Sequence, residues 1–106
     1  KNYEFIVANA HLHWNPARGD VKLYQMWALL KATERAVSQK SKEKRAVIIC
    51  GDLNSLPDSP PIQLVLDGNA KVSAEIYGQG LVSALIRKSK QILFPQVSKL
   101  KNVTRL

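Results

Sequence analysis

The chain has 106 residues, a formal net charge of +8, a hydrophobic share of 45% and one cysteine, Cys50. This length allows one small domain at most, and a lone cysteine excludes the internal disulfides that staple small secreted domains. The apolar runs are far shorter than the roughly 20 residues of a membrane-spanning helix, and the polar first residues are unlike a signal peptide, so we expect a soluble intracellular protein.

The first predicted element is a strand from Phe5 to Ala10, because this run is apolar or β-branched and contains no turn residue. Such a run predicts a strand that is buried on both faces. A loop rich in Pro, Gly, Asn and Asp then runs from His11 to Asp20. We expect Asp20 to cap the helix that follows, because its carboxylate can accept hydrogen bonds from first-turn amides.

A helix is predicted from about Val21 to Gln39, because apolar residues recur there at helical spacing and form one stripe. The stripe consists of Leu23, Met26, Trp27, Leu30 and Val37. The solvent side is expected to carry Lys22, Lys31, Arg35 and Lys40.

The second predicted buried strand is Ala46–Cys50, which ends at a Gly-Asp pair. A short helix follows, with Ser59 as its N-cap and Pro60 at its first position. It is expected to run to about Asp67, where Gly68 stops it. The order strand, loop, helix, strand predicts a layered α/β fold.

The pattern is weaker beyond Ala70, where Leu81–Lys90 is compatible with a short helix and Ile92–Leu106 with a strand or tail. Residues 71–106 carry a net charge of +6, against +2 for residues 1–70. A basic end of this kind attracts polyanions, nucleic acid above all. The commoner interpretation of a charge run is a solvated basic surface or a disordered end.

Asp52 and Asn54 follow the second strand. Because side chains alternate along extended backbone, Asp52 and Asn54 are expected to point to the same side, with Leu53 turned into the core. A carboxylate beside a carboxamide can orient one water, accept its proton and donate a hydrogen bond to a phosphate oxygen. Gly, Asp and Asn are also common turn formers, so the tetrad G-D-x-N by itself favours a structural turn.

His11 and His13 follow the first strand, and no further Cys or His lies nearby to complete a zinc site, so no metal ligand is assigned. A partly buried structural histidine is the alternative for His11, and His13 is expected to be structural or on the surface. Trp14, beside Pro16, can pack on a nucleobase or cover the edge of the core, and the second interpretation is favoured.

Three segments, Val7–Pro16, Asp20–Leu23 and Cys50–Ser59, closely resemble, in this order, the catalytic domain of carbon catabolite repressor type poly(A) deadenylases. These enzymes belong to the endonuclease/exonuclease/phosphatase superfamily. G-D-x-N alone indicates the superfamily, whereas H-L-H-W-x-P, D-V-K-L and D-L-N-S-L-P-D-S together are specific to the deadenylase branch. The resemblance implies a fragment of a four-layer α/β sandwich, with residues 1–72 as a partial domain and residues 73–106 as a divergent basic segment.

The resemblance also implies roles for four residues. Asp52 matches the aspartate that orients the attacking water, and Asn54 the asparagine that binds the scissile phosphate. His11 matches a histidine that contacts the same phosphate, and Pro16 a proline that packs on adenine. The resemblance implies Mg²⁺ as the cofactor. It implies RNA with a poly(A) tail as the partner, and a deadenylase complex as a further partner. The implied location is the cytoplasm, with the nucleus as a further location.

Two elements of the family pattern are missing from this sequence. In the family, the principal magnesium ligand is a glutamate on a strand that precedes the position matched by Lys1. The second essential histidine of the family lies in a C-terminal S-D-H type motif. We therefore expect an incomplete piece of a Mg²⁺-dependent 3′ to 5′ exoribonuclease that shortens poly(A) tails. The alternatives are another nuclease or phosphatase of the superfamily, and a non-catalytic RNA-binding fragment.

Overall fold

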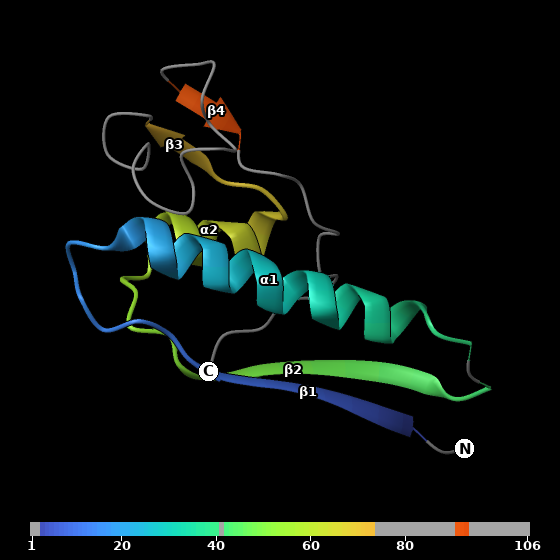
Figure 1. Cartoon of the computed structure of the whole chain (residues 1–106). Coiled ribbons are helices and arrows are strands. Elements are labelled where there is room, and N and C mark those ends of the chain that lie inside the picture. Colours follow the sequence, from blue (N-terminus) through green and yellow to red (C-terminus); the bar gives the residue numbers. More distant parts are fainter. Residues whose placement is uncertain (1–2, 41, 74–90, 94–106) are drawn as a thin grey trace.

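The computed structural model describes residues 3–40, 42–73 and 91–93 of the chain. Strand β1 (Tyr3–His11) and strand β2 (Lys44–Asp52) pair in parallel, in a register that runs from Tyr3 opposite Lys44 to His11 opposite Asp52. Helix α1 (Gly19–Ser38) connects them and helix α2 (Pro60–Asp67) follows β2 (Figure 1). This βαβ unit confirms the predicted α/β class.

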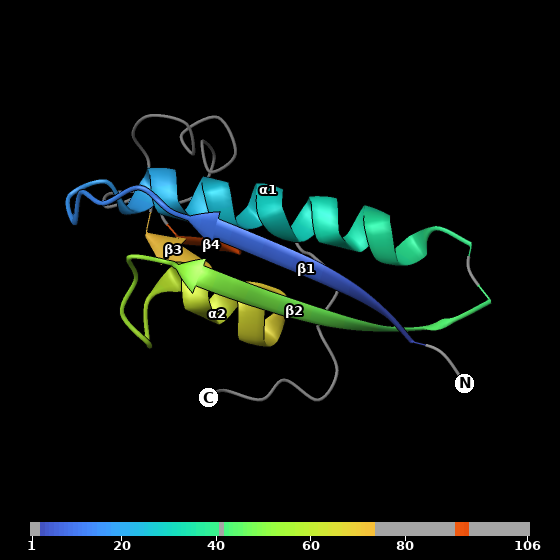
Figure 2. The same ribbon diagram turned by 90° about the horizontal axis from the view of Figure 1, so that it is seen from below.

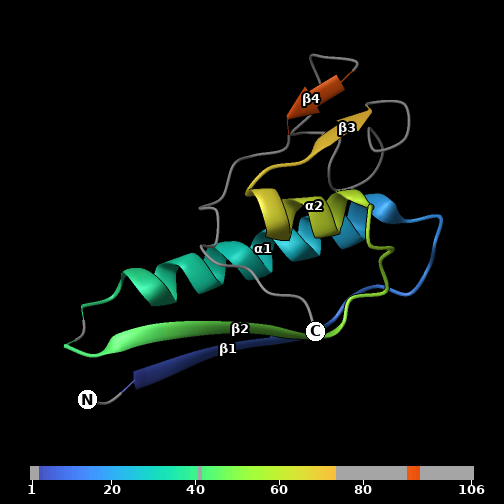
Figure 3. The same cartoon turned by 180° about the vertical axis from the view of Figure 1, so that it is seen from behind.

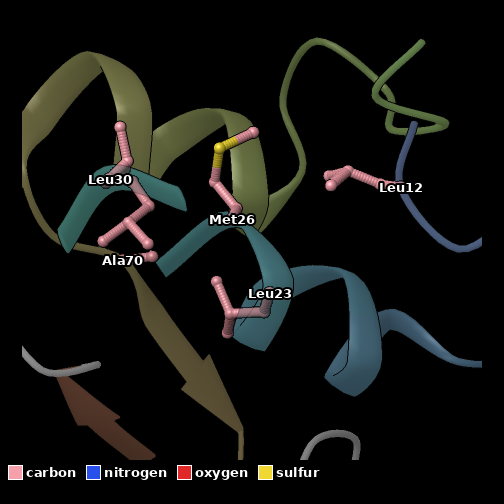
Figure 4. Packing of buried hydrophobic residues seen from close by; sticks show 6 residues of the cluster. Leu12, Leu23, Met26, Leu30 and Ala70 are labelled. Carbon is pink, nitrogen blue, oxygen red and sulfur yellow. The ribbon is translucent and has the colours of Figure 1, made fainter. Parts of the chain in front are cut away.

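Both helices lie on the same face of the β1–β2 sheet, as the views from below and from behind show (Figures 2 and 3). The hydrophobic core lies between the helices and this inner face of the sheet. Leu23 and Met26 on α1 and Leu64 on α2 are fully buried there. The complete cluster, shown in Figure 4, contains Leu12, Leu23, Met26, Leu30, Leu64 and Ala70.

The opposite, outer face of the sheet is exposed. Large apolar side chains lie on it with exposed fractions between 45% and 66%: Tyr3, Phe5, Val7 and Ile48. The prediction that both strands are buried on both faces is therefore wrong for the described residues, because the two helices cover only one face. An uninterrupted apolar run does not by itself reveal how many layers surround a strand.

Helix α1 begins slightly before the predicted start, with Arg18 as its N-cap residue. Asp20 lies in the first turn and not at the N-cap position, which Arg18 occupies, so its predicted position is wrong. Its carboxylate still interacts with a first-turn amide, because the backbone N–H of Val21 helps to lower the pKa of the carboxyl. Lys22, expected on the solvent side, is buried. Its long aliphatic chain can cover apolar surface beside the core.

Helix α2 begins and ends as predicted. Ser59 is the N-cap residue and Pro60 opens the helix. Gly68 ends it in the left-handed region at φ 77°, with its N–H donating to the Leu64 carbonyl at 3.0 Å. Glycine adopts this conformation without the steric cost that a Cβ would bring.

Two short strands complete the described part, β3 (Lys71–Ser73) and β4 (Gln91–Leu93), which pair antiparallel. The predicted helix at 81–90 lies outside the described residues, as do residues 94–106 of the predicted final strand or tail. No helix in the described ranges combines the length and apolar character needed to cross a membrane.

Candidate phosphate site at the end of the parallel strands

His11 and Asp52 form the last pair of the parallel ladder, where the two strand ends lie side by side (Figure 2). Nε2 of His11 lies 3.7 Å from Oδ2 of Asp52, and the two side chains are 74% and 66% exposed. Because side chains alternate along a strand, both belong to the outer face that also carries Val7 and Ile48. The structure thus brings together two of the predicted site residues, in a position that solvent and ligands can reach.

Gly51 allows the two strands to pair without a clash at this point. Its φ is +124°, and a Cβ built there would lie 1.9 Å from the carbonyl oxygen of Ala10 on the neighbouring strand. Only glycine meets both conditions without strain. Beyond the ladder, the N–H of Leu12 donates to the Asp52 carbonyl at 3.0 Å, so a hydrogen bond also joins Asp52 to the residue that follows β1.

Asn54 reaches the site by a turn and not by strand alternation. The strand ends at Asp52, and Asn54 has a positive φ of 44°. Its N–H donates to Oδ1 of Asp52 at 3.0 Å, and its Nδ2 donates to the Leu12 carbonyl at 2.8 Å. The extended-backbone argument is therefore wrong for Asn54, although Leu53 packs against the core as expected. Asn54 orients the Asp52 carboxylate and ties the two strand ends together.

The loop between β1 and α1 carries Trp14 and Pro16, both exposed, with 70% of Trp14 accessible. The expectation that Trp14 covers the core edge is thus wrong. The loop is fixed by Gln25 on α1, whose Oε1 accepts a hydrogen bond from the N–H of His13 at 2.8 Å. No sequence signal identified Gln25, because helical periodicity does not show which loop amide a polar side chain reaches.

An ion pair closes the same loop where α1 begins. The Arg18 guanidinium donates from Nε and Nη2 to the two carboxylate oxygens of Asp20, each at 2.9 Å. Asp20 is buried, and its hydrogen bond with Arg18 lowers the pKa of its carboxyl. Two parallel hydrogen bonds of this kind fix the loop end in one orientation.

Stability should fall in acid through this pair. A carboxyl with a lowered pKa in the folded state contributes stability that is present above its unfolded-state pKa, about 3.9, and is lost as the pH falls through the folded value. Urea unfolding at a series of pH values should show this loss in the unaltered chain and not in Asp20→Asn. Arg18→Gln should reduce the loss as well, whereas Arg35→Gln, which removes an exposed charge elsewhere on α1, should leave it unchanged.

The described residues do not by themselves form a metal centre, because no group of three or more His, Cys, Asp or Glu side chains among them could hold an ion. Asp52 supplies a carboxylate, the kind of hard oxygen ligand that Mg²⁺ takes in proteins. A complete magnesium site needs further ligands from other parts of a domain.

The comparisons with known proteins give a consistent set of relatives. No protein-family model matches the chain. Protein angel homolog 1 of Homo sapiens is 47% identical over 62 residues, which is 58% of this chain and 9% of that protein. Protein angel homolog 2 of Homo sapiens is 38% identical over 84 residues, 79% of this chain and 15% of that protein. The CCR4-Not complex 3′-5′-exoribonuclease subunit Ccr4 of Candida albicans is 34% identical over 80 residues, 69% of this chain and 10% of that protein.

A solved structure is similar in both sequence and fold. It is that of ANGEL2, a 2′,3′-cyclic phosphatase, in complex with adenosine-2′,3′-vanadate, with a TM-score of 0.58 and 35% identity. The match covers 72% of this chain and 23% of that one. The chain therefore spans only a small part of the length of the proteins that it matches.

Proposed function

We propose a function from the premise that this chain is a partial domain of the endonuclease/exonuclease/phosphatase superfamily, of the CCR4 type. In this proposal, the end of the β1–β2 ladder is one side of a hydrolytic site for phosphate esters at RNA ends, with a terminal 2′,3′-cyclic phosphate as the substrate. The observation that carries it is the exposed His11–Asp52 pair, with 3.7 Å between Nε2 and Oδ2. The ANGEL2 structure, at 35% identity, supports the choice of substrate.

Asp52 would orient and deprotonate the attacking water. Its Oδ1 accepts the N–H of Asn54, which leaves Oδ2 on the side of His11 to face a water. The water oxygen bonds to phosphorus while one ester bond to the ribose breaks. His11 in its protonated form can contact the phosphate oxygens and supply a proton to the departing ribose oxygen. The products are a phosphate monoester and one free ribose hydroxyl.

Mg²⁺ is the cofactor that we propose for the complete domain. Asp52 is a suitable oxygen ligand, but the described residues do not complete its site. Hydrolysis by a complete domain should therefore disappear in excess chelator and return when Mg²⁺ is added.

The second candidate function is removal of poly(A) tails by a 3′ to 5′ exoribonuclease. The similarity to Ccr4 supports it, at 34% identity over 80 residues, together with the exposed Pro16 in the loop that the deadenylase resemblance assigns to adenine. The substrate would be the poly(A) tail of RNA, and the partners those of a deadenylase complex. Both candidates place a phosphate at His11 and Asp52, and they differ in the bond that is broken.

A hybrid enzyme distinguishes the candidates. Residues 5–72 of this chain would replace the matching segment of ANGEL2, and the hybrid would be given adenosine 2′,3′-cyclic phosphate or an oligo(A) with a free 3′ end. We expect hydrolysis of the cyclic phosphate. Shortening of oligo(A) without hydrolysis of the cyclic phosphate would favour the exoribonuclease. A folded hybrid that is inactive on both, beside active ANGEL2, would contradict both candidates and favour a non-catalytic RNA-binding fragment.

Pro16→Ala in this hybrid should weaken the preference for adenine more than the overall rate. A contact with the base distinguishes nucleotides, whereas the phosphate chemistry is common to all of them. Contacts of this kind are worth about 1 to 3 kcal/mol, so the ratio of kcat/KM for adenosine over uridine 2′,3′-cyclic phosphate should fall by roughly fivefold or more. Pro57→Ala, in the exposed loop after β2, is the matched control. An equal loss on both nucleotides would exclude a base contact for Pro16.

A further inference from the structure

We propose that Trp14 is a stacking platform for a nucleobase, placed at the rim of the His11–Asp52 pair. The proposal rests on the proposed function, because it assumes that the phosphate of the same nucleotide lies at that pair. It assigns a residue to base recognition in addition to the proline of the same loop.

The two tryptophans of the chain differ in environment. Trp27 packs against the core, with its ring centroid 5.8 Å from that of Tyr24. Trp14 is 70% exposed, and its ring has one aromatic neighbour in the described part of the chain, His13, at 6.0 Å and a tilt of 33°. An indole is the largest apolar side chain, and leaving it in water forgoes a sizeable burial energy. This exposure on an ordered loop points to a ligand.

The backbone of the loop that carries the indole is fixed before any ligand arrives. The N–H of His13, the residue before Trp14, donates to Gln25 at 2.8 Å. On the other side, Asn15 accepts hydrogen bonds from the N–H of Ala17 at 2.9 Å and from the N–H of Arg18 at 3.0 Å. A ring on a fixed loop loses little conformational freedom when a base stacks on it.

The position of Trp14 in the chain suits a nucleotide. Trp14 follows His11 by three residues, which span at most roughly 10 Å. A nucleotide whose phosphate lies at His11 can therefore bring its base to the indole. In the sequence, Trp14 is followed by Asn15, Pro16, Ala17 and the partly exposed Arg18. This segment contains no other large apolar side chain, unlike the broad apolar patch that a protein partner buries.

Fluorescence of the complete 106-residue chain tests the proposal. In the variant Trp27→Phe, all tryptophan emission comes from Trp14. Titration with AMP, or with adenosine 2′,3′-cyclic phosphate, should quench this emission, whereas ribose 5-phosphate, which has no base, should bind without quenching it. In the reciprocal variant Trp14→Phe, the emission of Trp27 should stay unchanged.

Calorimetric affinities for AMP and ribose 5-phosphate provide a second test of the proposal. Trp14→Ala should weaken AMP binding by about fivefold or more and leave ribose 5-phosphate binding unchanged, and Trp14→Phe should retain most of the AMP affinity. Leu56→Ala is the matched control, since Leu56 is 73% exposed on the other loop at this end of the sheet.

Each other outcome has a definite meaning. Equal AMP affinity in Trp14→Ala and the unaltered chain, or an equal loss in Leu56→Ala, would overturn the stacking role while the proposed function stands. If the folded, unaltered chain binds neither AMP nor ribose 5-phosphate, the phosphate site itself fails, and the base platform fails with it.

Discussion

Replacing Asp52 with alanine should lower hydrolysis by the hybrid of this chain with ANGEL2 by about 100-fold or more, the typical loss when a general base is removed. The side chain is 66% exposed, so its loss should change the free energy of unfolding by only about 0.5 kcal/mol. The expected result is therefore a folded protein with a rate defect. Hydrolysis of adenosine 2′,3′-cyclic phosphate under saturating substrate, together with urea unfolding, measures both quantities.

Asp52→Asn separates the two tasks of the carboxylate. In the unaltered chain, the N–H of Asn54 donates to Oδ1 of Asp52 at 3.0 Å, and the amide oxygen of the variant can still accept this hydrogen bond. The amide cannot take a proton from water. We expect this variant to be as inactive as the alanine variant. Asp58→Ala, which removes an exposed carboxylate from the following loop, is the control and should keep its activity. More than about half of the unaltered turnover in either Asp52 variant would exclude Asp52 as the base.

Much of the fold follows from local sequence patterns. Pro60 at the first helical position and Gly68 in the left-handed region define the two ends of α2, and each residue type has a physical reason to stand there. Ser59 occupies the predicted N-cap position, but its side chain makes no capping hydrogen bond. The burial of the strands could not be predicted in the same way. Phe5 and Val7 are apolar like core residues, yet they lie on an uncovered face, and the sequence of a strand does not record which layers are packed on it.

The site was predictable to the extent that it follows from topology. The carboxyl ends of parallel strands meet at one edge, so a strand that ends at His11 and another that ends at Asp52 bring these side chains together. The contact of His13 with Gln25 and the turn at Asn54 were not predictable, because each depends on a tertiary contact between residues distant in sequence. The ion pair between the partly exposed Arg18 and the buried Asp20 was missed for a different reason, since an aspartate at the start of a helix is usually expected to be a cap.

Gly51 should be the position at which the smallest substitution has the largest effect on folding. Gly51→Ala adds one methyl group where the Ala10 carbonyl oxygen is only 1.9 Å away, and it forces an L-residue to adopt φ +124°. The clash is with backbone atoms, which cannot rotate away as the end of a side chain can. Overpacking and a disfavoured backbone conformation each cost about 1 to 3 kcal/mol, so a loss of about 2 to 6 kcal/mol in the free energy of unfolding is expected.

The structural change should be greatest at the end of the sheet that carries His11 and Asp52. Ala10 and Gly51 are opposite one another, immediately before the His11–Asp52 pair, so separating them removes the register that holds the two side chains together. Urea unfolding should therefore show Gly51→Ala to be strongly destabilised, and the same change in the hybrid should abolish hydrolysis even where the protein remains folded. Gly19→Ala is the matched control: this glycine opens α1, has no positive φ, and should tolerate a methyl group without loss. If the free energy of unfolding of Gly51→Ala lies within about 0.5 kcal/mol of that of the unaltered chain, the backbone geometry described for Gly51 is wrong. The geometry assigned to His11 and Asp52 would then be wrong as well.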